Sequence, residues 1–335
     1  MKIIKHRTIP YRIIIDEVLL RRLTHGHNKL SVINEDLLNR RKGFKGEQNI
    51  DYYLQRMNKQ YYMVFHDLRL TIGHATFQID TLLLSRFLAL IIEIKNFSGI
   101  LTFDTKSNQF TRTYNNEESG FKNPISQASE HRELFINWLH SNNIFNLPVE
   151  YVVGISEPST LIKALPGSES IYQKVLHFDH LKSKISNFEG KYIKPVLDTN
   201  TLNQLSEELC QSHLPFRPKD PLSIYGLKKK EIIKGVACLT CSFIPLQRTY
   251  GRWYCPRCKC FSTNAHNLSL LDYFVIVNPT ITNKQAREFL RHDNRKSMHR
   301  LLTSSGLHFT GENKGRLYYP FSIQSYLSMI DTKNT

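Results

Sequence analysis

Two carboxylates and one lysine interrupt some of the most apolar segments of this 335-residue chain: Asp80, Glu93 and Lys95. Ionised groups near an apolar core cost several kcal/mol unless they are paired or bind a metal ion, so their presence needs a reason. In a strand, alternation places Glu93 and Lys95 on one face, while Ile92 and Ile94 point the other way. If Asp80 lies on the neighbouring antiparallel strand, the three groups surround a hydrated divalent cation. Oxygen ligands of this kind favour Mg²⁺ or Mn²⁺.

Such a site has the components that phosphodiester hydrolysis needs. The metal ion activates water and neutralises developing charge, and a cation such as Lys95 orients the nucleophile or stabilises the transition state. Glu47 is a candidate for an outer or third oxygen ligand, and Gln127 for orienting water or substrate. The alternative is a partly exposed Glu93–Lys95 pair on an edge strand, with Asp80 in a turn. The apolar flanking segments leave both interpretations open.

Hydrophobic periodicity predicts the elements that position these residues. A helix is expected to begin at Gly43–Glu47. The carboxylate of Glu47 lies on the same, otherwise apolar, face of this helix as Ile50, Leu54 and Met57. Strands are expected at Tyr62–Leu68, Phe77–Leu84, Phe87–Ile94, Val149–Ile155 and Lys174–Phe178. Helices are expected from Pro124 to about His140, and near residues 180–188 and 200–211. This alternation predicts an α/β domain.

The helix after Pro124 places Gln127 and His131 on one face, together with apolar residues. For His131, a hydrogen-bonded core histidine is a simpler interpretation than a metal ligand. Gln127 alternatively caps or bridges buried backbone.

Four short motifs carry a family resemblance. They are Gly43-Phe44-Lys45-Gly46-Glu47, Gln78-Ile79-Asp80, Ile92-Glu93-Ile94-Lys95-Asn96-Phe97-Ser98-Gly99 and Asn123-Pro124-Ile125-Ser126-Gln127. In this order and spacing they resemble the nuclease-related domain (NERD) family, over roughly residues 38–190.

The resemblance implies the restriction-endonuclease-like fold, in which helices flank a mixed central sheet that carries an Asp...Glu-x-Lys site for DNA cleavage. It assigns catalytic positions to Asp80, Glu93 and Lys95, with Glu47 and Gln127 as supporting residues. All five residues are present in this chain.

Cys238, Cys241, Cys255 and Cys258 form two CxxC pairs separated by 13 residues. Four thiolates that close a tetrahedron are typical of structural Zn²⁺, and the segment between the pairs can fold as a short hairpin. The alternative is reduced, unligated cysteines or a disulfide, which leaves so small a segment without an adequate core. Cys260 is taken as a non-ligand, although exchange with Cys258 stays open. The segment resembles zinc ribbons appended to nucleic-acid enzymes, and basic residues surround the pairs.

The C-terminal residues predict three helices and a hairpin. A helix runs from Leu268 to about Val277, Thr282 caps Asn283–Leu290, Asn294 caps Arg295–Thr303, and His308–Tyr319 forms the hairpin. This order resembles a winged helix-turn-helix module, whose third helix enters the major groove of DNA. The predicted nucleic-acid contacts are Arg295, Lys296, Arg300, Lys314 and Arg316. The alternative is a small helical cap with a solvated basic face.

Charge supports a polyanionic partner. The chain has 45 Lys and Arg against 29 Asp and Glu, a net charge of +16, and residues 221–335 hold +11 of it. The first twenty residues mix charges through their apolar positions, which argues against a signal peptide. The longest strongly apolar stretch, Phe87–Ile92, is far short of the ~20 residues of a membrane helix. A cytoplasmic protein without a membrane partner is expected.

The sequence therefore predicts an N-terminal extension (1–37), a NERD nuclease-like α/β domain (38–212), a linker (213–234), a zinc ribbon (235–263) and a winged-helix-like module (264–330). The leading hypothesis is a Mg²⁺-dependent deoxyribonuclease that is targeted by its C-terminal modules. The alternatives are a non-catalytic DNA-binding or regulatory protein and an RNA nuclease.

Overall fold

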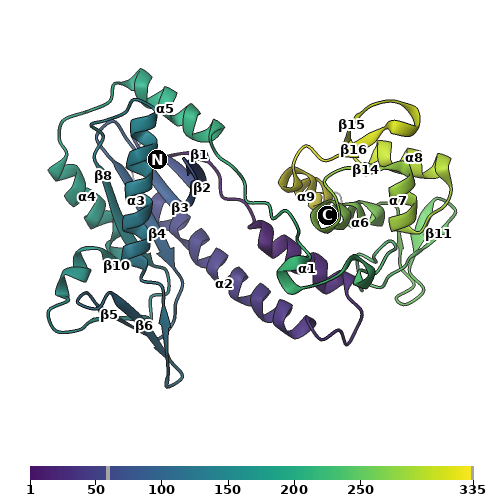
Figure 1. Ribbon diagram of the computed structural model, residues 1–335, viewed down its shortest axis with the longest axis horizontal. Coiled ribbons are helices and arrows are strands. Elements are labelled where there is room, and N and C mark those ends of the chain that lie inside the picture. Colours follow the sequence, from purple (N-terminus) through teal and green to yellow (C-terminus); the bar gives the residue numbers. More distant parts are fainter. Residues whose placement is uncertain (58–60, 333–335) are drawn as a thin grey trace. The chain divides into compact units, whose positions relative to one another are not determined.

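The computed structural model describes residues 1–57 and 61–332, without the side chains of Lys314 and residues 330–332. The chain divides into two compact units (Figure 1). Unit 1 contains Met1–Thr8 and Arg41–Phe216, and unit 2 contains Ile9–Arg40 and Arg217–Thr335. The N-terminal residues, which the sequence assigned to neither folded region, thus contribute to both units.

A six-stranded mixed sheet forms the centre of unit 1. Its order is β1 (Lys2–Lys5), β2 (Met63–Ile72), β3 (Ala75–Leu84), β4 (Ala89–Lys95), β8 (Val149–Ile155) and β10 (Val175–His177). β2, β3 and β4 are antiparallel to one another, whereas β1 is parallel to β2, and β4, β8 and β10 are parallel. The predicted mixed central sheet is confirmed.

Helices cover both faces of this sheet. α3 (Pro124–Ser141) and α5 (Thr199–Gln211) bury Phe135, Trp138 and Leu205 against one face. α2 (Leu30–Gln55) and α4 (Leu181–Lys191) bury Ile50 and Ile185 against the other. Burial on both faces explains why the predicted strands read as nearly continuous apolar runs instead of alternating ones.

A second sheet in unit 1 was not predicted from the sequence. Its order is β7 (Glu117–Phe121), β6 (Gln109–Tyr114), β5 (Ile100–Asp104) and β9 (Leu161–Ala164). β6 and β7 are rich in polar residues and β9 has only four residues, so these strands lack the long apolar runs that reveal a strand. Asn115 and Asn116 both have positive φ, which suits the tight turn between β6 and β7. Short 3-10 helices, η1 (Glu169–Gln173) and η2 (Phe178–His180), flank β10.

Unit 2 has one continuous core, to which its N-terminal helices contribute. α1 (Tyr11–Arg22) buries Ile14 and Val18 in the same cluster as Phe274 of α6 (Ala265–Ile276). Residues 222–232, with η3 (Ser223–Tyr225) and η4 (Lys229–Glu231), also bury apolar side chains there. This stretch falls within the predicted linker, whose Pro-spaced composition concealed its packing.

The remaining elements of unit 2 are small sheets and short helices. They are β11 (Gln247–Thr249), β12 (Arg252–Tyr254), β13 (Phe261–Ser262), β14 (Ile281–Thr282), α7 (Asn283–Leu290), α8 (Arg295–Ser304), β15 (His308–Thr310), η5 (Asn313–Gly315), β16 (Leu317–Tyr319) and α9 (Ile323–Thr332). The strands form two antiparallel sheets, β11-β12-β13 and β14-β16-β15. α9 was not predicted.

A buried charge cluster joins α1 to α6 within unit 2. Arg22 and Asp272 are fully buried, and Nε of Arg22 donates to Oδ2 of Asp272 at 2.7 Å. Arg21 donates to the same carboxylate at 2.8 Å, and Nη1 of Arg22 donates to the Gly235 carbonyl at 2.7 Å. Each buried charge therefore has partners that offset its loss of hydration.

None of the helices that lie within residues 1–57 and 61–332 combines the length and apolar character needed to cross a membrane.

Candidate active site and metal centre

The register of β3 and β4 brings Asp80 beside Glu93. Thr81 pairs with Ile92, so Asp80 and Glu93 are the next residues along the two antiparallel strands. Residues opposite each other in such a pair share a face of the sheet. Oδ2 of Asp80 accepts a hydrogen bond from the Ile94 backbone N–H at 2.8 Å, which fixes the carboxylate at the end of the ladder.

Glu93 is a buried acid at the centre of the sheet, and only 1% of it is exposed. Its strand β4 lies between β3 and β8, so the alternative of an exposed pair on an edge strand is wrong. Nζ of Lys95 donates to Oε1 of Glu93 at 2.7 Å, as two residues on one strand face permit. The predicted Glu-x-Lys pair is thus present as a direct contact.

Gln127 reaches the same lysine from α3. Lys95 donates to Oε1 of Gln127 at 3.2 Å. Asn123 caps this helix by accepting from the Ile125 N–H at 3.0 Å, and Pro124 occupies the first turn. The Asn-Pro-x-x-Gln motif therefore starts the helix at a defined residue and places Gln127 in its first turns.

His131, one helical turn further along α3, also faces the site. Its Nδ1 lies 3.5 Å from Oε2 of Glu93, which is long for a hydrogen bond but close enough for an electrostatic contact. The expectation of an ordinary core histidine missed this proximity to the buried carboxylate.

Close packing at Gly46 positions Glu47. A Cβ on Gly46 would lie 2.4 Å from Cβ of Asn96 and 2.6 Å from Oγ of Ser156, so only glycine fits there. Asn96 also donates from Nδ2 to the Lys42 carbonyl at 2.6 Å and accepts from Ser156 at 2.8 Å. These contacts hold α2 against the ends of β4 and β8.

Arg7 belongs to this site although nothing in the sequence singled it out. Its side chain is 4% exposed, and Nη1 donates to Oε2 of Glu47 at 3.2 Å and to Oδ1 of Asp67 at 2.7 Å. Nη2 lies 3.0 Å from Nδ1 of His66 and donates to Oγ1 of Thr81 at 3.1 Å. A lone arginine far from the motifs carries no spacing signal. Only the parallel pairing of β1 with β2 brings it here.

The carboxylates perturb one another. Burial, and then the charges of Glu93 and Glu47, raise the pKa of Asp80 well above its usual value. Burial and the charge of Asp67 raise the pKa of Glu47 to about 7, although Arg7 opposes them. Burial also acts to raise the pKa of Glu93, but the neighbouring His131 and Lys95 outweigh it and leave the pKa below its usual value. Crowded carboxylates of this kind are stabilised in their charged form by a cation.

The donor atoms fit a divalent cation of the Mg²⁺ type. Oε2 of Glu93 is buried and has no hydrogen-bond partner within the described part of the chain. Mg²⁺ commonly uses one or two protein carboxylates and keeps several water molecules. Asp80 and Glu93 offer such an open set, whereas Glu47 is engaged by Arg7.

The four predicted cysteines form a compact cluster in unit 2. The sulfur atoms of Cys238, Cys241, Cys255 and Cys258 all lie within 4.8 Å of one another, an arrangement suited to one metal ion. Among the residues that the structure describes, no other group of three or more His, Cys, Asp or Glu is so close. Cys260 is exposed outside the cluster, and its thiol contacts the Cys258 carbonyl.

Backbone amides support the cysteine cluster. Burial raises the pKa of Cys238, but hydrogen bonds from the backbone N–H groups of Cys241 and Thr240 lower it to about 7. Trp253 of the intervening β12 is buried and donates to Nδ1 of His266 at 3.2 Å. The small hairpin is therefore tied to α6.

The predicted nucleic-acid contacts lie on α8 and near β16. Arg295, Lys296 and Arg300 are exposed on α8, whose opposite side buries Met298 and Leu302. The Arg316 guanidinium lies 4.3 Å from the centre of the Phe309 ring. The side chain of Lys314 lies outside the described part of the structure.

The chain is similar to the crystal structure of protein VC1899 from Vibrio cholerae, with 9% identity and a TM-score of 0.25. The alignment covers 55% of this chain and spans about half (51%) of that protein. No curated protein matches. Residues 42–156, which include Glu47, Asp80, Glu93, Lys95 and Gln127, match the family model of the nuclease-related domain, so this chain carries a NERD domain.

Proposed function

We propose that this protein is a metal-dependent nuclease that hydrolyses phosphodiester bonds in DNA. The observation that carries the proposal is the contact of Lys95 with both Glu93 and Gln127, beside Asp80 on the neighbouring strand. A buried glutamate, a lysine and a partly buried aspartate from two adjacent strands form the set that phosphodiester hydrolysis requires. The match to the nuclease-related domain agrees with it.

The proposed roles follow from the contacts. Asp80 and Glu93 would hold Mg²⁺ or Mn²⁺, which when bound supplies charge neutralisation and an acidic water molecule. Lys95 presents its ammonium group to a phosphate oxygen or to the attacking water, and Glu93 and Gln127 keep it in place. Glu47 is available as a further oxygen donor once its contact with Arg7 is released.

We propose Zn²⁺ for the cysteine cluster. With Zn–S bonds of about 2.3 Å, a tetrahedral site has sulfur–sulfur edges of about 3.8 Å. The observed separations are 3.5 Å for Cys238–Cys258 and 3.6 Å for Cys241–Cys255. Four thiolates leave no open coordination position, so the role is structural.

Unit 2 is proposed to bind DNA through a winged helix-turn-helix arrangement. Exposed Arg295, Lys296 and Arg300 on α8 would face the major groove, and Lys314 and Arg316 near β16 would contact the phosphate backbone. Residues 221–335 carry a net charge of +11, which favours a polyanion.

The test is incubation of the full-length protein with linear, circular and single-stranded DNA in Mg²⁺ or Mn²⁺. Wild type and Glu117→Ala, which alters an exposed glutamate on β7, should cleave, whereas Glu93→Ala should not. Competition with RNA of the same sequence shows whether the protein prefers DNA or RNA as its substrate. If wild type and Glu93→Ala bind DNA equally and neither cleaves it, the protein is instead a non-catalytic DNA-binding protein.

A further inference from the structure

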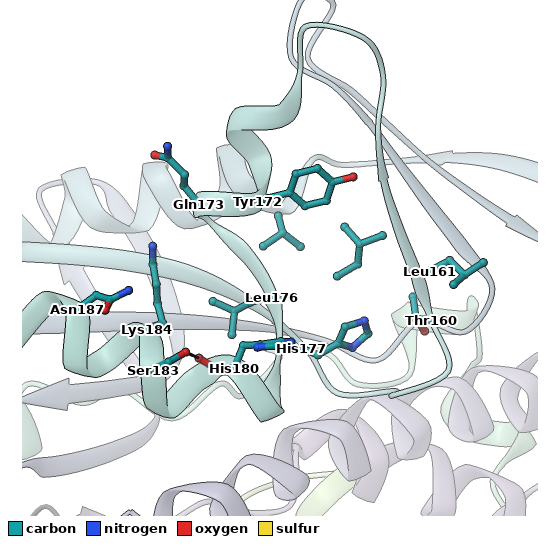
Figure 2. Close-up of a pocket in the computed structure, with 12 residues that line it drawn as sticks. Thr160, Leu161, Tyr172, Gln173, Leu176, His177, His180, Ser183, Lys184 and Asn187 are labelled. Carbon is teal, nitrogen blue, oxygen red and sulfur yellow. Dashed lines mark hydrogen bonds between the residues drawn. The ribbon is translucent and has the colours of Figure 1, made fainter.

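A cavity in unit 1 lies between β9, β10 and the start of α4 (Figure 2). Its volume is about 610 Å³, within the range of small-ligand sites. Figure 2 shows the ring of Tyr172 on one side and the imidazole of His177 on the other, with Lys184 and Asn187 along α4. None of the twelve lining residues is Asp or Glu. The cavity therefore offers a cation, imidazoles and an aromatic face, and no carboxylate that would repel an anion.

The groups that line the cavity are held in place. The Tyr172 hydroxyl accepts a hydrogen bond from the Ala164 N–H at 3.2 Å, while the side chain remains about half exposed (53%). Nζ of Lys184 lies 5.1 Å from the centre of the Phe188 ring, which orients the ammonium group without neutralising it. An aromatic surface that is anchored at one end and open on its face is suited to stacking against a planar base.

One buried polar atom of the cavity has no partner in the described part of the chain. Nδ1 of His177 is buried and makes no hydrogen bond. Unpaired buried polar atoms are uncommon in folded proteins and often belong to a functional site.

The sheet places this cavity next to the proposed catalytic site. Ile155 at the end of β8 pairs with Lys95 on one side and with His177 on the other. Lys95 and His177 therefore end two strands on the same row and the same face, two strand spacings apart, or about 10 Å. That separation corresponds to roughly three nucleotides of one strand at 3.4 Å per step.

We propose that this cavity binds a nucleotide of the substrate strand close to the cleaved bond. Lys184 pairs with the phosphate, the base stacks on Tyr172, and Asn187 offers hydrogen-bonding groups to the nucleotide. The proposal rests on the proposed nuclease function, because it takes the ligand to be part of the strand that enters the Lys95 site. A free nucleotide has the same chemistry, and the experiment separates the two sources.

The test is binding of a fluorescent trinucleotide of single-stranded DNA to the full-length protein without divalent metal, measured by anisotropy. Lys184→Gln and Tyr172→Ala should each weaken binding about five- to tenfold, as expected for one phosphate contact and one stacked base. The matched controls are Lys182→Gln, an exposed lysine of α4 outside the cavity, and Tyr172→Phe, which keeps the ring. Both should bind within about twofold of wild type, and melting temperatures verify that all four variants fold. Because unit 2 is the same in every variant, any trinucleotide binding by unit 2 is the same in each and cancels when the variants are compared.

Competition by an unlabelled deoxynucleoside monophosphate identifies the source of the ligand. Weak competition supports a strand, and competition as strong as that of the trinucleotide supports a free nucleotide. If Lys184→Gln and Tyr172→Ala bind like their controls, the cavity is not a nucleotide site, whatever the cleavage assay shows. If the trinucleotide binds as expected but wild type fails to cleave DNA, the nuclease proposal fails alone.

Discussion

The two regions that we propose to bind metal ions are built in opposite ways. The four cysteines of unit 2 lie within 21 consecutive residues, and two short knuckles bring them together. The carboxylate site of unit 1 contains Glu47, Asp80, Glu93 and Gln127, together with Arg7, which follows the first strand. The cysteine site is closed and suits a structural ion, whereas the carboxylate site is open and suits a reacting one.

This difference has a physical consequence. Local spacing can specify the cysteine cluster because each knuckle is a turn of a few residues. The carboxylate site depends on the register of three strands and on the packing of two helices, so changes far from the reacting atoms should disturb it. Substitutions in each region, taken from the largest expected effect to the smallest, test this comparison.

Loss of a cysteine ligand should have the largest effect. Cys255→Ser should abolish binding of about one Zn²⁺ per chain and unfold much of unit 2, because structural zinc supplies about 10–16 kcal/mol in small metal-dependent folds and Cys238 and Cys255 are part of the unit's core. Metal analysis and hydrogen exchange measure both effects. Cys260→Ser is the matched control, and loss of zinc in that variant would show that Cys260 is a ligand.

Removal of the buried carboxylate of Asp272 should come next. Asp272→Ala leaves Arg22 buried without its charged partner, which should lower the free energy of unfolding of unit 2 by about 3–5 kcal/mol. Denaturant unfolding measures it, with the exposed Asp293→Ala as a control. An unchanged stability would mean that the α1–α6 cluster does not hold the unit together.

The ion pair of Arg22 and Asp272 also predicts how the stability of unit 2 depends on pH. Burial acts to raise the pKa of Asp272, but Arg21 and Arg22 outweigh it and leave the pKa below its usual value. Its contribution to stability is therefore fully present above about pH 4, the usual pKa of an aspartate, and is lost as the pH falls through the lowered pKa. The difference in the free energy of unfolding between wild type and Asp272→Ala should therefore shrink only below about pH 4.

A methyl group at Gly46 should distort the carboxylate site from a distance. Gly46→Ala forces Asn96 and Ser156 apart from α2, which should cost about 1–3 kcal/mol of stability and displace Glu47. Gly43→Ala is the control, because a Cβ there meets no atom within 4 Å. Melting temperature and DNA cleavage are the measurements. Equal behaviour of the two variants would contradict the close packing of α2 on the strand ends.

The smallest effect should come from a helix cap in unit 2. Asn294 accepts a hydrogen bond from the Ser297 N–H at 2.8 Å, so Asn294→Ala should cost about 1 kcal/mol. Thr303→Ala, an exposed change near the other end of α8, should cost less. Chemical denaturation compares them, and a larger loss in Thr303→Ala would refute the capping role.

Several features could be predicted from the sequence because they are local. The cysteine knuckles, the caps of α7 and α8, and the buried strands β3, β4 and β8 each follow from residue types within a few positions. The Glu93–Lys95 pair is also local, since alternation along one strand places both on one face. The second sheet was missed because its segments lack the long apolar runs that reveal a strand. α9 was also missed, although Ser322 accepts a hydrogen bond from the Ser325 N–H at its start.

Other features were decided by the tertiary structure alone. The parallel pairing of β1 with β2 brings Arg7 to Glu47, and packing around Gly46 sets the position of α2. The common row of Lys95, Ile155 and His177 likewise depends on the pairing of three strands that are far apart in the sequence. The sequence by itself determined which chemical groups each strand and each CxxC pair carries. Long-range strand pairing decided which charged groups meet, because the register between distant strands is not set by the residue spacing within either strand.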